Sequence, residues 1–346
     1  MSDRVLTQRE LNRALLARQL LLERVDLSIP KALERICGIQ NQYAPNAYIR
    51  LWSMLEGFKR DDLTRAYEKK AVVQATLLRG TIHTVAATDY PVFAAAIREP
   101  IRAWARRAYR VDDPDRDLVV ARLRDALGGR TVSRTELMEL RQGATASAWG
   151  TIDIDAGLIR VPPSGTWERR RAHTFGLASD WLDESEPPPE DSAQEQLVRR
   201  YLGAFGPAGL SDITAFTGIP VTTLRAVLER LTLRRFVDER GKELLDVPGA
   251  PLPPANTPAP VRFLPTWDAM LLVHARRTGI LDEEYRKIIF HVKVPPSFPT
   301  FLVDGRVVGT WKFADGRVVL DPFEPLTKAT SRALDDEAER LAAFHA

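Results

Sequence analysis

Apolar residues recur at helical spacing along most of the chain, and shorter strand-like runs separate these segments. Within residues 7–23, Leu11 and Leu15 fall on one face of a helix, and Thr7 with Glu10 forms a capping-box pattern. The same spacing predicts further helices over residues 29–39, 61–70, 88–109, 115–127, 133–141, 193–205, 210–218, 221–231 and 328–344. The chain is therefore expected to be mainly helical.

Two-stranded ribbons are predicted directly after two groups of helices. Residues 72–87 change to strand-like content with a turn at Arg79 and Gly80. In residues 193–247, three helical segments precede two strands, and Ser211 is a candidate N-cap of the middle helix. Helices followed by a ribbon are typical of a winged helix-turn-helix.

The rest of the pattern suggests where this architecture divides. Strand-rich sequence with Asp-Gly turns at Asp304 and Asp315 fills the C-terminal part. Proline-rich segments at 185–192 and 248–260 resemble connectors. We predict an α+β fold, mainly α with β wings, built from tandem winged helix-turn-helix units. The expected divisions are unit 1 at 1–110, unit 2 at 111–189, unit 3 at 190–258, and a β-rich region with a final helix at 259–346.

Composition narrows the function classes only modestly. The chain has 45% hydrophobic and 27% charged residues and a formal net charge of +3, which suits a soluble protein and permits a nucleic-acid partner. The single cysteine, Cys37, excludes a disulfide within the chain and a thiolate zinc site. The five histidines have no partner at ligand spacing, and no nucleotide-binding glycine motif occurs, so we expect no metal and no cofactor.

The sequence also predicts a cytoplasmic location. Its first residues lack the apolar stretch of a secretory signal. No apolar run approaches the ~20 residues that a helix needs to cross a bilayer, so we expect no membrane association.

Several segments in a fixed order resemble one family. They are CGIQNQYAPNAYIRLWSMLEGF (37–58), LLRGTIHTV (77–85), FLPTWDAMLL (263–272), LVDGRVVGTWKF (302–313) and DPFEPL (321–326). Each segment alone is weakly specific, but the ordered set is similar to the AlkZ-like DNA glycosylases, which include the bacterial YcaQ group.

This resemblance implies winged helices around a concave surface that binds double-stranded DNA. It implies hydrolysis of the N-glycosidic bond of alkylated purines, above all N7-alkylguanine, with N3-alkyladenine and interstrand cross-links as further substrates and without strand cleavage. It also implies a nucleoid-associated protein, which we expect to be a monomer. The family motif Gln-x-Gln falls on Gln40 and Gln42, which are therefore the expected catalytic residues; Asn41 stands where the family often has an apolar residue.

The chemistry of the leaving group explains how two glutamines suffice. A purine alkylated at N7 or N3 already carries positive charge, so it departs without being protonated. The enzyme then needs only to orient a water, and an amide offers both an acceptor and donors for this. Residues i and i+2 share one side in extended backbone, so the amides of Gln40 and Gln42 are able to converge there. The alternative interpretation is a polar helix end that caps backbone groups.

Other candidate DNA contacts are cationic or lie near the motif. Arg98, Arg102, Arg106 and Arg110 recur every four residues and predict a basic helix face, or else a solvated one. The remaining candidates are Asn41, Arg79, His83, Arg169, Arg170, Asp268, Arg276 and Arg277. For His83 a hydrogen-bonded structural role is the alternative. For Asp268, an ion pair with Arg276 or Arg277 is the more economical interpretation.

Two non-enzymatic functions compete with the glycosylase. Residues 193–247 favour a winged-helix transcription regulator, although their third helix offers only Arg225 and Arg230 as cations. A DNA-bound scaffold or drug-sequestering protein is a further alternative. Release of a free base separates the enzyme from both.

Overall fold

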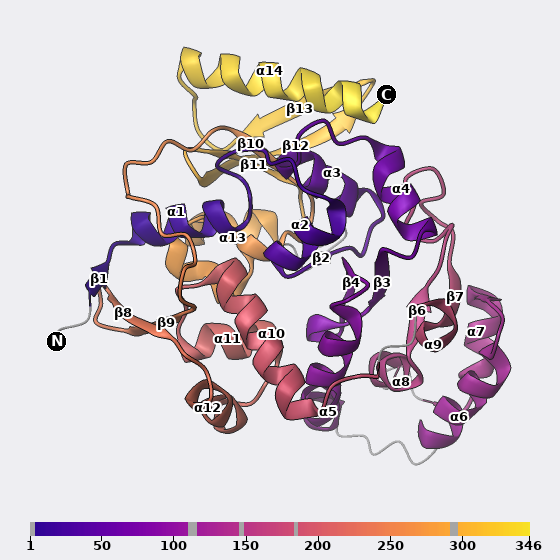
Figure 1. The fold of residues 1–346 in the computed structure, drawn as a ribbon. Helices are drawn as coiled ribbons and strands as arrows, with labels where there is room; N and C mark the ends of the chain where they lie inside the picture. The colour runs from indigo at the N-terminus through magenta and orange to yellow at the C-terminus, as the bar shows by residue number, and fades with distance from the viewer. Residues whose placement is uncertain (1–3, 110–115, 145–148, 183–185, 291–296) are drawn as a thin grey trace.

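The computed structural model describes residues 4–109, 116–144, 149–182, 186–290 and 297–346, which form helices around three sheets (Figure 1). The α-helices are α1 Gln8–Arg18, α2 Ile29–Ile36, α3 Pro45–Met54, α4 Arg60–Glu68, α5 Tyr90–Tyr109, α6 Arg116–Leu127, α7 Arg134–Leu140, α8 Trp149–Ala156, α9 Ala178–Trp181, α10 Glu190–Phe205, α11 Leu210–Thr217, α12 Val221–Glu229, α13 Glu283–Ile289 and α14 Lys328–His345. The strands are β1 Arg4–Leu6, β2 Ile39–Gln40, β3 Val72–Thr76, β4 Ile82–Ala86, β5 Val132–Ser133, β6 Leu158–Arg160, β7 Thr174–Leu177, β8 Arg234–Asp238, β9 Glu243–Asp246, β10 Arg262–Leu264, β11 Thr300–Val303, β12 Arg306–Ala314 and β13 Arg317–Pro322. Short 3₁₀ helices are η1 Leu78–Gly80, η3 Ala269–Leu271 and η4 Val273–Thr278. The α+β class expected from the sequence is confirmed.

Element boundaries differ from the predictions where the backbone leaves helical geometry. The helix expected over 29–39 ends at Ile36, because Cys37 and Gly38 take left-handed φ angles of 63° and 78°. Ser211 is not the N-cap of α11; Gly209 is, and its N–H donates to the Asp212 carboxylate at 3.0 Å. The predictions do not include α3, in which all ten residues are buried; its polar residues Asn46, Arg50 and Ser53 recur at helical spacing but face the interior.

The largest sheet has six strands in the order β2-β4-β3-β6-β7-β5. Strands β3 and β4 form the predicted hairpin, and β6 pairs with β3 through Ala75 and Ile159. The sheet therefore continues from the first predicted unit into the second, so these two units share backbone hydrogen bonds. A separate small core, centred on Leu123, Leu137 and Phe175, packs the helices of the second unit.

The third predicted unit has the expected order of α10, α11 and α12 followed by the antiparallel ribbon β8–β9. Strand β1 adds to this ribbon in parallel with β8, so the N-terminal residues complete its three-stranded sheet. Helix α10 packs along α5, as Figure 1 shows, and contributes to the same hydrophobic core as the first unit.

The C-terminal region forms the four-stranded sheet β10-β11-β12-β13, with α14 packed on β13 (Figure 1). Both predicted Asp-Gly turns are present: Asp304, Gly305, Asp315 and Gly316 all have positive φ angles between 46° and 78°. Trp311 is buried and donates from its indole nitrogen to Leu264 O at 3.0 Å. It is therefore a core residue of this sheet.

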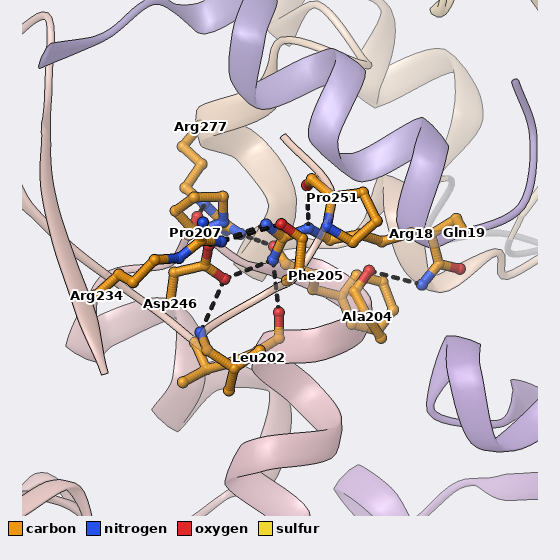
Figure 2. Close-up of polar contacts among 12 residues, drawn as sticks. Arg18, Gln19, Leu202, Ala204, Phe205, Pro207, Arg234, Asp246, Pro251 and Arg277 are labelled. Atoms are coloured by element: carbon orange, nitrogen blue, oxygen red, sulfur yellow. Dashed lines mark hydrogen bonds and ion pairs between the residues drawn. The ribbon is translucent and has the colours of Figure 1, made fainter. Parts of the chain in front are cut away.

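A buried ion-pair cluster joins the N-terminal helix to the third unit (Figure 2). Arg18 donates from Nη1 and Nη2 to the two Asp246 oxygens, at 2.6 and 3.0 Å, and also from Nη1 to Leu202 O. Arg234 donates to Asp246 Oδ2 at 2.5 Å from the ribbon itself. The cluster thus fixes α1 against α10 and β9.

Candidate active site

The backbone after α2 places Gln40 in a short strand rather than on a helix. The left-handed residues Cys37 and Gly38 reverse the chain, and β2 then pairs with β4 so that Gln40 lies opposite His83. A Cβ added at Gly38 would lie 2.8 Å from Val85 Cγ1, so this close approach requires glycine. The reversal therefore brings the motif onto the β3–β4 hairpin.

The two glutamine amides lie against each other, as their extended backbone predicted. Gln40 Nε2 donates to Gln42 Oε1 at 2.6 Å; Gln40 is 6% exposed, whereas Gln42 is exposed. The helix-end interpretation does not fit, because both residues lie beyond α2 and these amides bond to side chains. The pair thus runs from the protein interior to the surface.

Arg79 and His83 hold the inner end of this pair. Arg79 Nη2 donates to Gln40 Oε1 at 2.8 Å and lies 3.3 Å from His83 Nε2. A guanidinium has only donors, so His83 Nε2 accepts, and the protonated Nδ1 donates to Thr81 O at 3.0 Å. His83 is therefore in the neutral Nδ1–H form.

Burial and the neighbouring guanidinium explain the charge states of these groups. Burial, reinforced by the charge of Arg79, lowers the pKa of His83 to about 3. Burial lowers the pKa of Arg79 to about 10, which still leaves it charged at neutral pH. The site therefore presents one fixed cation, a neutral imidazole and two amides, and none of these changes protonation near pH 7.

Aromatic rings of the third unit, together with His274 of η4, form the floor below Arg79. Its guanidinium carbon lies 4.9 Å from the centre of the Phe216 ring, a cation–π distance. Tyr201, Phe205 and His274 pack around Phe216 with ring-centre distances of 4.8 to 5.0 Å. The sequence carried no signal for this floor, because Phe216 lies far from the motif in the chain.

Arg170 of the second unit, a predicted DNA contact, reaches Tyr43 beside the outer glutamine. Arg170 Nη1 donates to the Tyr43 hydroxyl at 3.3 Å, and its guanidinium stacks 4.5 Å from the Trp167 ring centre. Tyr43, next to Gln42 in sequence, is 49% exposed, and Arg169 is exposed too. Sequence reasoning missed Tyr43, although its position beside the motif was a usable signal.

The predicted basic face of α5 is largely neutralised. Arg102 Nη2 pairs with the buried Asp155 at 2.5 Å and also with Glu99, and Arg98 lies 3.7 Å from Asp155. Arg106 is exposed, whereas Arg110 lies outside the described residues. Arg102 is therefore bound to carboxylates of its own chain, which argues against its phosphate contact.

Asn41 points away from this surface. It is 1% exposed, and its Nδ2 donates to Thr84 Oγ1 at 2.9 Å and to Tyr67 OH at 3.3 Å. Side chains alternate along extended backbone, so its neighbours Gln40 and Gln42 face the opposite way. A DNA contact by Asn41 is thus not supported, and its polarity is explained by hydrogen bonds inside the protein.

The predicted partners of Asp268 are wrong. Asp268 Oδ2 pairs with Arg50 Nε at 2.9 Å, both side chains are buried, and Oδ1 caps η3 at Met270 N. Arg276 instead pairs with Glu283 at 3.1 Å on the surface. Asp268 therefore has a structural role between α3 and η3.

Arg277 likewise makes its hydrogen bonds inside the protein. It donates from Nε to Pro207 O at 2.6 Å and also to Phe205 O (Figure 2). Its Nη1 lies 3.3 Å from Asp212 Oδ2. Its side chain is 7% exposed. These contacts join η4 to the end of α10, and they leave little of Arg277 for a DNA contact.

Comparison with known proteins identifies the family of this chain. The family described as "DNA glycosylase AlkZ-like" matches residues 33–344, which is most of the sequence. This chain belongs to the AlkZ-like family. The match includes the Gln40–Gln42 motif, the β3–β4 hairpin and the C-terminal sheet.

A curated relative and a solved structure extend over nearly the whole chain. An "Interstrand DNA cross-link repair glycosylase" of Streptomyces sahachiroi is 24% identical over 357 residues, covering 94% of this chain and 93% of that protein. The structure of Streptomyces sahachiroi DNA glycosylase AlkZ aligns with a TM-score of 0.81 and 20% identity, covering 99% of this chain and 97% of that one. The AlkZ-like chain therefore shares this fold from end to end.

Two kinds of feature are absent from the described residues. None of the helices in those ranges is long and apolar enough to cross a membrane. Within the same ranges, no three or more His, Cys, Asp or Glu side chains are grouped as a metal site requires.

Proposed function

We propose that this AlkZ-like chain is a monofunctional DNA glycosylase that hydrolyses the N-glycosidic bond of cationic alkylpurines. The observation that supports this most directly is the contact between Gln40 and Gln42, with Gln42 exposed and Gln40 anchored inside. N7-alkylguanine is the expected lesion, and N3-alkyladenine and interstrand cross-links are further candidates.

The chemistry of the site suits a leaving group that needs no acid. The neutral His83 has its Nε2 occupied by Arg79, so it is not a proton donor toward a base. Gln42 still offers its Nε2 hydrogens and a second lone pair on Oε1 to a water. The water adds to C1′ of deoxyribose as the C1′–N9 bond breaks, the base leaves neutral, and the proton of the water passes to solvent.

A monofunctional reaction fits the residues around the motif. A bifunctional glycosylase attacks C1′ with an amine and cuts the strand. In the described part of the chain, the side chains hydrogen-bonded to Gln40 and Gln42 belong to Arg79 and to the pair itself, not to a lysine.

We infer that the DNA lies across the side of the molecule where Arg170, the neighbour of Arg169, contacts Tyr43 next to Gln42. These side chains are exposed, and Arg170 is positioned by Tyr43 and Trp167. The order of α10, α11, α12 and β8–β9 supports a winged-helix unit in the third predicted unit.

The test is release of a base from a duplex that carries a single N7-methylguanine, followed by alkaline cleavage of abasic sites. Gln40→Ala and Gln42→Ala are each expected to lower the single-turnover rate roughly 10- to 1000-fold, the effect of removing one oriented polar group. Gln142→Ala, at an exposed glutamine near the end of α7, is the matched control and keeps the wild-type rate.

Two outcomes would count against the proposal. Wild-type protein that binds one DNA sequence tightly and releases no base supports a transcription regulator. Strand cleavage without alkali contradicts the monofunctional reaction, because hydrolysis by water leaves the sugar–phosphate chain intact.

A further inference from the structure

A hydrogen-bonded chain with a single possible direction runs from Arg79 to the surface. Arg79 offers only donors, so the Gln40 atom facing it is the carbonyl oxygen, at 2.8 Å. The Gln40 amide nitrogen then faces Gln42 and meets its oxygen at 2.6 Å. Arg79 therefore sets the orientation of both amides, because its guanidinium is able only to donate.

Arg79 is itself held in a conformation that few side chains adopt. It lies in the β3–β4 turn at φ 56° and ψ 21°, a left-handed geometry in which glycine or asparagine is usual. The turn thus carries a bulky cation at a strained position, and an observed strain of this kind points to a role for the side chain.

Burying the Arg79 guanidinium also removes its charge from water, and, in the part of the chain that the structure describes, no ion pair compensates for this loss of hydration. Its Nη1 is buried without a hydrogen-bond partner, and no carboxylate of the described residues neutralises its charge. Its contacts are Gln40, His83 and the face of Phe216. The interactions of this cation are with the groups that it contacts, and Gln40 is the one nearest the surface.

We propose that Arg79 is a positioning residue, which orients the Gln40 amide so that Gln40 in turn orients Gln42 toward the attacking water. A charge-assisted bond to the Gln40 oxygen polarises its N–H groups and strengthens the donation to Gln42. Gln42 is the residue that touches the water, and Gln40 transmits the direction. This inference rests on the proposed function, and it replaces the phosphate contact that the sequence suggested for Arg79.

Rate and affinity distinguish the two roles of Arg79. We expect Arg79→Met to lower the single-turnover rate on N7-methylguanine DNA about 10- to 100-fold while the dissociation constant of undamaged duplex changes less than about twofold. Arg79→Lys keeps the charge and is expected to recover part of the rate. Arg332→Met, at an exposed residue of α14, is the control and leaves both quantities unchanged.

A double-mutant cycle tests whether Arg79 acts through Gln40. In a Gln40→Ala background, Arg79→Met should cause no further loss of rate, because the amide that it orients is gone. Losses that multiply overturn the inference. So does a wild-type rate combined with weaker binding and a salt slope reduced by about one, which is the signature of a phosphate contact.

The orientation itself has a readout that does not need catalysis. In protein labelled with ¹⁵N-glutamine, the Gln40 side-chain amide signal is identified by its loss in Gln40→Ala. It should shift in Arg79→Met and stay in place in Arg332→Met. If it shifts but Gln40→Ala excises the base at the wild-type rate, the proposed function fails and the positioning stands; if it does not shift, the positioning fails.

Discussion

His83 couples the hydrogen bonding of the site to the protein's stability at acidic pH. Its imidazole is 2% exposed, and both ring nitrogens are used, one by Arg79 and one by Thr81. Protonating Nε2 would place a second cation against the guanidinium. The folded protein therefore keeps His83 neutral, whereas the unfolded chain takes up a proton below the ordinary pKa of about 6.5.

This difference gives a signed prediction for stability. The pKa of His83 is about 3 in the folded protein, so between pH 6.5 and 3 the unfolded state binds more protons and stability rises with pH. Between pH 7 and pH 5, His83 alone should remove about 2 kcal/mol from the free energy of unfolding. Urea denaturation at both pH values should show a smaller pH effect in His83→Gln, whose oxygen is able to accept from Arg79.

A matched variant makes the comparison specific. His173 is exposed, so His173→Gln should retain most of the pH effect of the wild type. An equal pH effect in wild-type protein and His83→Gln would mean that the folded protein tolerates a charged His83. The hydrogen-bond assignment of the site would then be wrong.

At the scale of elements, the sequence predicts those features that depend on residues close together in the chain. The β3–β4 hairpin, the Asp-Gly turns and the glutamine pair follow from spacing and turn chemistry within a few residues. The sequence does not show that the polar residues of α3, such as Arg50, are buried. The partner of Asp268 is equally invisible, because Arg50 is distant in sequence while Arg276 and Arg277 are close.

The Arg50–Asp268 pair yields a prediction about how α3 is fixed to the C-terminal region. Asp268→Asn keeps an oxygen to cap η3 but leaves the Arg50 guanidinium buried without its counter-charge. Breaking one side of a buried pair typically costs about 3–5 kcal/mol, so we expect a loss of this size in the free energy of unfolding. Differential scanning calorimetry provides the measurement.

The surface pair near η4 is the natural comparison for Asp268→Asn. Arg276 and Glu283 side chains are 49% and 64% exposed, so Arg276→Met should cost less than about 1 kcal/mol. Equal effects of the two variants would show that the burial of the Arg50–Asp268 pair has no energetic consequence.

At the scale of the whole molecule, the distribution of charge matters more than its sum. The net charge is only +3, and many arginines are bound to carboxylates inside or between elements, such as Arg18 with Asp246 and Arg102 with Asp155. Arg169 and Arg170 are exposed, and Arg170 contacts Trp167 and Tyr43, which are neutral; Tyr43 follows Gln42 in sequence. The DNA surface that we propose is therefore a local cationic patch on an almost neutral protein.

Salt dependence tests this distribution directly. Each phosphate contact contributes about 0.9 to the slope of log affinity against log salt concentration, so Arg169→Met with Arg170→Met should lower that slope by about two. Arg102→Met removes one charge, but Arg102 is already paired with Asp155 and Glu99, so the slope should hardly change. Fluorescence anisotropy over a salt series separates these cases. A slope that depends on Arg102 and not on Arg169 and Arg170 would place the DNA along α5 instead, away from the two glutamines.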